Sequence, residues 1–206
     1  MKKYVNLFVF VFMIGACLSQ GRAQTKSAVS YKNPVVDIAM PDPTVIKAAD
    51  GYFYVYATES TRNVPIMKSK DLVEWTYCNT AFTNKTRPRF EPKAGIWAPD
   101  INYINGKYVL YYAMSVWGGE QTCGIGVATA NSPQGPFTDH GKMLRSNEIG
   151  VQNSIDPSLL QYEGRNYLVW GSFRGIYVIE LTTDGLSIMP GAKKKRIAGT
   201  AFEAVY

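Results

Sequence analysis

The chain has 206 residues, a formal net charge of +6, three cysteines and one histidine. Three of the positive charges, on Lys2, Lys3 and Arg22, lie in an N-terminal leader, so the rest of the chain carries only about +3. The other basic cluster, residues 193–196, has no aromatic residues among its charges, as binding of single-stranded nucleic acid would require. We therefore exclude nucleic acid as a partner and interpret this cluster as a solvated loop between strands.

The first residues are typical of an export signal. An apolar run, residues 4–16, follows Lys2 and Lys3 and is too short to span a bilayer. The signal ends either at Ala23, giving a leader of residues 1–23, or at residue 16, before a lipobox-like Cys17 that would carry a lipid anchor. Both alternatives predict export, to the periplasm, the medium or the outer membrane, and any membrane attachment would be through Cys17 alone.

The remaining cysteines, Cys78 and Cys123, lack the spacing of metal ligands, and His140 is the only histidine. We predict neither cysteine as a nucleophile, and export permits a disulfide without indicating one. The sequence Thr138–Gly141 predicts a blade-edge loop with His140 at its surface.

After the leader, short aromatic and β-branched runs alternate with Gly, Asn, Asp and Pro, which predicts an all-β fold. A unit occurs three times: an acid-led strand, a tight turn with Gly, and a second aromatic strand. The turn glycines are Gly51, Gly106 and Gly164, at successive spacings of 55 and 58 residues.

Each unit continues with a third strand and an edge-like fourth segment. The third strands are predicted over 64–67, 124–128 and 175–179, and the fourth segments over 71–75, 132–137 and 184–187. Four antiparallel strands repeated at this period are typical of β-propeller blades. The segment 202–206 resembles the opening strand of a fourth blade, so we expect a propeller truncated to three blades and one strand.

Four acids hold the same place at the start of these units: Asp42, Asp100, Asp156 and Glu203. A single acid before a strand commonly caps local backbone amides. Four in register favour another role, because the first strand of each propeller blade lines the central channel. We expect them to converge on one axial pocket.

Carboxyl groups paired in a cleft suit cleavage of a glycosidic bond. One stays protonated to donate to the leaving oxygen, and the other is ionised to activate water. A third carboxylate raises the pKa of the acid by repulsion between like charges.

The motifs at Pro41–Pro43, Trp97–Asp100, Ser154–Pro157 and Phe202–Ala204, in this order and at blade spacing, resemble glycoside hydrolase family 43. The resemblance spans residues 33–206 and implies a five-bladed propeller and an inverting mechanism. It implies that Asp42 is the general base, Glu203 the general acid, and Asp156 the group that tunes the pKa of Glu203. Trp97 and Asp100 would line the substrate cleft.

Two segments, 96–101 and 171–177, look most like the endo-acting 1,5-α-L-arabinanases of that family, so the expected substrate is α-1,5-linked arabinan or its oligosaccharides. Alternatives are an exo-acting arabinofuranosidase or β-xylosidase, a non-catalytic carbohydrate-binding propeller, and an inactive fragment. The chemistry requires no cofactor. The family often holds a structural calcium ion on the propeller axis, but no residue here is matched to it as a ligand.

Overall fold

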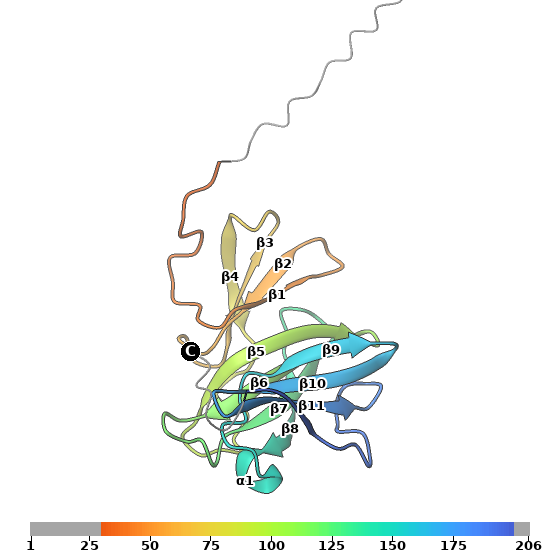
Figure 1. Ribbon diagram of the computed structural model, residues 1–206. Coiled ribbons are helices and arrows are strands. Elements are labelled where there is room, and N and C mark those ends of the chain that lie inside the picture. Colours follow the sequence, from red (N-terminus) through yellow and green to blue (C-terminus); the bar gives the residue numbers. More distant parts are fainter. Residues whose placement is uncertain (1–29, 200–206) are drawn as a thin grey trace, which may run out of the picture. The chain divides into compact units, whose positions relative to one another are not determined.

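The computed structural model describes residues 30–199, which form three four-stranded sheets and one short helix (Figure 1). The first sheet contains β1 (Thr44–Lys47), β2 (Phe53–Tyr56), β3 (Pro65–Ser69) and β4 (Trp75–Thr80). The second contains β5 (Gly95–Ile104), β6 (Lys107–Ser115), β7 (Gly124–Ala130) and β8 (Thr138–Arg145). The third contains β9 (Ser158–Tyr162), β10 (Arg165–Ser172), β11 (Gly175–Leu181) and β12 (Lys195–Ala198), and the helix α1 (Ser146–Ile149) follows β8.

Each sheet is an antiparallel meander in which strands consecutive in sequence are neighbours, so the predicted all-β repeat of four-stranded units is confirmed. The first hairpin of each sheet turns at Gly51, Gly106 or Gly164, all with φ between 74° and 84°. Asn105 and Glu163, which precede two of these glycines, also have positive φ. Two consecutive residues with positive φ form the tight hairpin turn that matches strand twist.

The predicted fourth strands were wrong in position: β4 begins only at Trp75, the last residue of the segment 71–75, and β8 and β12 begin after the segments proposed for them. Asp71 Oδ1 accepts hydrogen bonds of 2.9 Å from both the Val73 and Glu74 amides. Likewise, Asp184 Oδ1 accepts from the Leu186 amide at 3.0 Å. These aspartates satisfy local N–H groups that a strand would pair across the sheet, so the segments fold as turns.

Two smaller predictions need correction. The basic cluster was placed in a loop, but Lys195 and Arg196 begin the exposed edge strand β12, where Arg196 pairs with Tyr177. His140 is exposed, as predicted, but lies within strand β8, and its Nε2 is 2.8 Å from Thr129 Oγ1.

The second sheet is buried on both faces, and β6 shows why. Alternate side chains of a strand point to opposite faces. Leu110, Tyr112 and Met114 join a hydrophobic cluster with the first sheet, whereas Val109 and Tyr111 join another with Leu168 and Trp170 of the third sheet. The three sheets therefore pack face to face in chain order.

The chain divides into residues 1–30 and 31–206, and all three sheets belong to the second unit. The predicted leader, Cys17, Glu203 and the predicted strand 202–206 lie outside the described residues. Within 30–199, no helix is long and apolar enough to cross a membrane.

Candidate active site

A cavity of about 360 Å³ is lined by strand residues of the second and third sheets and by the segments that precede or connect the strands. It brings together three predicted site residues: Asp42 before β1, Trp97 in β5 and Asp156 before β9. The other lining residues are Ser115–Glu120 at and after the end of β6, Asn153 and Ile155 before β9, and Ser172 and Phe173 at the end of β10.

Asp42 is exposed, and a hydrogen bond from Thr58, in the connection between β2 and β3, orients its carboxylate. The Thr58 hydroxyl donates to Asp42 Oδ2 at 2.6 Å and accepts from the Ala98 amide at 2.7 Å. Ala98, with a φ of 36°, lies in the bulge that interrupts β5 between Trp97 and Asp100. The irregularity of β5 thus positions the Asp42 carboxylate through Thr58.

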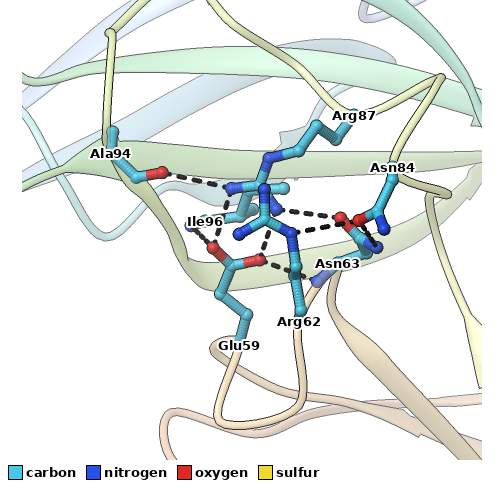
Figure 2. Close-up of polar contacts among 7 residues, drawn as sticks. All are labelled: Glu59, Arg62, Asn63, Asn84, Arg87, Ala94 and Ile96. Carbon is cyan, nitrogen blue, oxygen red and sulfur yellow. Dashed lines mark hydrogen bonds and ion pairs between the residues drawn. The ribbon is translucent and has the colours of Figure 1, made fainter.

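The residue after Thr58 anchors this connection in the protein interior (Figure 2). Glu59 Oε1 and Oε2 accept hydrogen bonds of 2.8 and 2.9 Å from Arg87, and the Ile96 and Asn63 amides donate to the same carboxylate. Burial alone would raise the pKa of Glu59, but these hydrogen bonds and the charge of Arg87 outweigh it and lower the pKa. Glu59 is therefore a buried anion with all its partners in place.

Asp156 has a pKa raised to about 6, first because the protein around its carboxyl group displaces water and second because of the negative charge of Asp42, although the residue is partly exposed. The side chain still reaches the cavity. A carboxyl group with a pKa near 6 exchanges its proton close to neutral pH, and such groups are concentrated at functional sites. The negative charge of Asp42 is therefore close enough to disfavour ionisation of Asp156.

Asp42 and Asp156 share an unusual backbone conformation, with φ values of 48° and 55°. Aspartate tolerates this left-handed region better than most residues, yet a residue held there costs about 1–3 kcal/mol. Strain of this kind persists where the surrounding structure enforces it, often at active sites. Here it places both carboxyl groups on one cavity.

Aromatic side chains form part of the cavity wall. The rings of Trp97 and Trp117 lie 5.5 Å apart between centroids at an angle of 51°, and Trp117 is 95% exposed. Phe173, 41% exposed, lines the same cavity. Trp117 was not among the site residues predicted from the sequence. The available signal was a lone tryptophan before Gly118–Gly119, two residues after the end of a buried strand.

Asp100, predicted to line the cleft, is not among the residues that line this cavity. Its Oδ2 accepts hydrogen bonds of 2.7 Å from both the Asn102 side chain and the Leu159 amide of β9. Burial raises its pKa despite these bonds. Asp100 thus links the second sheet to the third.

The calcium ion implied by the family resemblance stays a prediction, and no residue is assigned to it as a ligand. No group of three or more His, Cys, Asp or Glu residues between 30 and 199 could hold a metal ion. Cys78 and Cys123 are both free thiols, and burial raises the pKa of each, which disfavours the thiolate that a nucleophile or metal ligand needs.

A β-fold with two interacting carboxyl groups and exposed aromatic rings in one cavity is typical of a carbohydrate-cleaving enzyme. The chain belongs to glycosyl hydrolases family 43, whose sequence profile matches residues 31–206.

Among its relatives, the extracellular endo-α-(1→5)-L-arabinanase 1 of Bacillus subtilis is 38% identical over 140 residues, covering 64% of this chain and 43% of that protein. The arabinan endo-1,5-α-L-arabinosidase A of Aspergillus niger is 32% identical over 137 residues, covering 64% of this chain and 41% of that protein. The chain therefore spans less than half the length of these relatives.

Among solved structures, the Cellvibrio cellulosa α-L-arabinanase complexed with arabinohexaose matches with a TM-score of 0.69 and 28% identity. The match covers 79% of this chain and 54% of that one. The native Bacillus subtilis arabinanase matches with a TM-score of 0.66 and 32% identity over 76% of this chain and 56% of that one.

Proposed function

We propose that the full-length protein is an inverting endo-acting glycosidase that cleaves α-1,5-linked L-arabinan. The observation that carries this proposal is the cavity in which Asp42 and Asp156 interact beside Trp97 and Trp117. The arabinan-cleaving relatives support the choice of substrate, as does the related structure with bound arabinohexaose.

In the proposed mechanism, Asp42 is the general base. Thr58 donates to Oδ2, while Oδ1 has no hydrogen-bond partner among residues 30–199 and is available to a water molecule. Asp42 takes a proton from that water as the water attacks the anomeric carbon. Inversion requires the base and the acid to lie about 6.5–9.5 Å apart, to leave room for the water.

Glu203 is the proposed general acid, which protonates the leaving glycosidic oxygen, and Asp156 is the residue that raises its pKa. A carboxylate near Glu203 disfavours ionisation of Glu203, because two like charges repel each other. The position of Asp156 supports this role, since it lines the same cavity as the proposed base Asp42. Trp97 and Trp117 offer apolar ring faces against which arabinose rings pack.

We further propose that the three sheets are blades of a five-bladed propeller. Their face-to-face packing in chain order supports this, and so does the greater length of the relatives. Export through the leader at residues 1–23, or lipidation at Cys17, is the corresponding proposal for location. The extracellular relative from Bacillus subtilis supports export.

The experiment is digestion of linear 1,5-arabinan by the full-length protein, with products resolved by size over time. Asp42→Asn is the test variant, and Asp37→Asn, at an exposed position away from the cavity, is the matched control. We expect an early ladder of arabino-oligosaccharides from the wild type and from Asp37→Asn, and none from Asp42→Asn. Arabinose alone would instead identify an exo-acting enzyme, and full activity of Asp42→Asn would refute the assigned base.

A further inference from the structure

A second cavity, of about 390 Å³, lies beside the Glu59–Arg87 ion pair and is rich in cationic side chains. Arg62, Arg87, Arg89 and Lys93 line it, with Glu91 as its only acid. The remaining lining residues are Pro88, Pro92, Ala94 and Met114. The proposed mechanism uses none of these side chains.

The two acids in and beside this cavity are already neutralised by internal partners. Glu59 is paired with Arg87, whose Nη1 and Nη2 also donate to Asn63 Oδ1 at 2.8 Å and to the Ala94 carbonyl at 3.1 Å (Figure 2). Glu91 forms an ion pair with Arg145 and accepts a hydrogen bond of 3.1 Å from Thr122 Oγ1. Neither acid is left to balance further positive charge.

Three cations at this cavity, Arg62, Arg89 and Lys93, have no carboxylate partner among residues 30–199. Asn84 holds two of them: Arg62 Nε donates to its side-chain oxygen at 3.0 Å, and Arg89 Nη2 donates to its carbonyl at 2.8 Å. Both guanidinium groups keep N–H donors without a protein acceptor, and all three side chains are exposed. Like charges collected in this way repel one another, so an anionic ligand would be bound favourably here.

The basic cavity adjoins the candidate active site along two strands. Met114 lines the basic cavity, and the next residue of β6, Ser115, lines the cavity of Asp42. On β5, a methyl group placed on Gly95 would lie 2.6 Å from Trp97 Nε1 and 3.6 Å from Glu59 Oε1. Trp97, which lines one cavity, and the Glu59–Arg87 pair, which lies beside the other, are therefore both close to Gly95.

We infer that this basic cavity binds the carboxylate groups of an acidic, uronic-acid-containing polysaccharide. The planar guanidinium groups of Arg62 and Arg89 suit carboxylate oxygens, which they can bind in bidentate fashion. The choice of a polysaccharide rests on the proposed function, since the neighbouring cavity is proposed to bind a glycan. The site would hold an acidic glycan segment near the neutral chain that is cleaved.

The test measures binding of the full-length protein to polygalacturonate by affinity electrophoresis. The test variant is Arg62→Gln/Arg89→Gln. The matched control is Lys193→Gln/Lys194→Gln, which removes the same charge from exposed residues outside this cavity. We expect the arginine variant to bind about tenfold more weakly, which corresponds to the loss of charge-assisted hydrogen bonds. The lysine variant should bind within about twofold of wild type, and added salt should weaken wild-type binding.

Three results would overturn the inference. Equal losses in the arginine and lysine variants would show attraction by net charge alone. Undiminished binding to fully methyl-esterified polygalacturonate, which has no free carboxylate, would exclude carboxylate recognition. Competition by millimolar inorganic phosphate as strong as that by galacturonate oligomers would also overturn it, by showing a general small-anion site.

The arabinan digestion separates this inference from the proposed function. Arg62→Gln/Arg89→Gln should still cleave neutral linear arabinan, whereas Asp42→Asn should still bind polygalacturonate. Both arginines are exposed, so an unchanged melting temperature serves as the check that the variant is folded.

Discussion

The Glu59–Arg87 pair provides the sharpest test of what holds the first two sheets together. Arg87→Met keeps much of the side-chain volume but removes four hydrogen bonds, two to Glu59, one to Asn63 and one to the Ala94 carbonyl. The two side chains are only 7% and 10% exposed, so Glu59 would be left as a buried charge without its partner. Breaking a buried pair in this way costs about 3–5 kcal/mol, a large part of the roughly 5–15 kcal/mol that stabilises a typical protein.

The loss should depend on pH with a definite sign. The pKa of Glu59 is lowered in the folded protein, so the pair contributes its full stability above the unfolded-state pKa of about 4.3 and loses it as pH falls through the folded-state pKa. In Arg87→Met, Glu59 can be protonated more easily, which relieves part of the penalty in acid. The difference between wild type and variant should therefore be largest near pH 7 and smaller near pH 4.

Urea unfolding followed by tryptophan fluorescence at both pH values would measure these free energies. Arg165→Met is the matched control, because its ion pair with Glu180 has a separation of 3.6 Å and the Arg165 side chain is 63% exposed. Exposed pairs contribute about 0–1 kcal/mol. Similar losses for the two variants, or a loss for Arg87→Met that does not change with pH, would refute the account of the buried pair.

Three further predictions concern the candidate active site. Asp42→Asn should lower the pKa of Asp156 from about 6 but leave it above the ordinary value, because burial is the larger cause of the shift. A carboxyl NMR titration would measure this pKa, and an unchanged value would mean that the two groups do not interact. Trp117→Ala should weaken the binding of arabinohexaose, measured by calorimetry, about tenfold. The melting temperature should not change, since Trp117 is 95% exposed, and an unaltered affinity would exclude Trp117 from the substrate site. Thr58→Val removes the hydroxyl that lies between Asp42 and the Ala98 amide, and it should reduce kcat about tenfold. Thr58→Ser keeps a hydroxyl and should retain activity. Equal losses in the two variants would argue against positioning of Asp42 through this hydroxyl.

Features set by local chemistry were predictable from the sequence. The hairpin turns at Gly51, Gly106 and Gly164 need residues that tolerate positive φ. The regular spacing of these glycines made the repeat and its strands recognisable in the sequence. Asp42 and Asp156 precede the first strands of their sheets in the same register. Because the sheets pack in chain order, this shared register brought both residues to one cavity.

Features set by contacts distant in sequence were not predictable in this way. Asp100 has the same place in the repeat, but the bulge at Ala98 shifts the pairing of β5, and the Asp100 carboxylate binds the Leu159 amide. That bulge is held by Thr58, which lies 40 residues earlier in the chain. The place of Trp117 in the cavity likewise could not be predicted, because it depends on the packing of its glycine-rich loop near Trp97.

The left-handed backbone at Asp42 and Asp156 also limits how this site can change over evolutionary time. At φ values of 48° and 55°, most side chains pay a steric penalty, while Asn and Gly are tolerated. A descendant that loses the carboxyl chemistry can keep its fold most easily by acquiring Asn or Gly at these two positions. A change to Val or Ile would remove the carboxyl group and also strain the backbone. Selection should therefore act against such variants for their lower stability as well as for their loss of function.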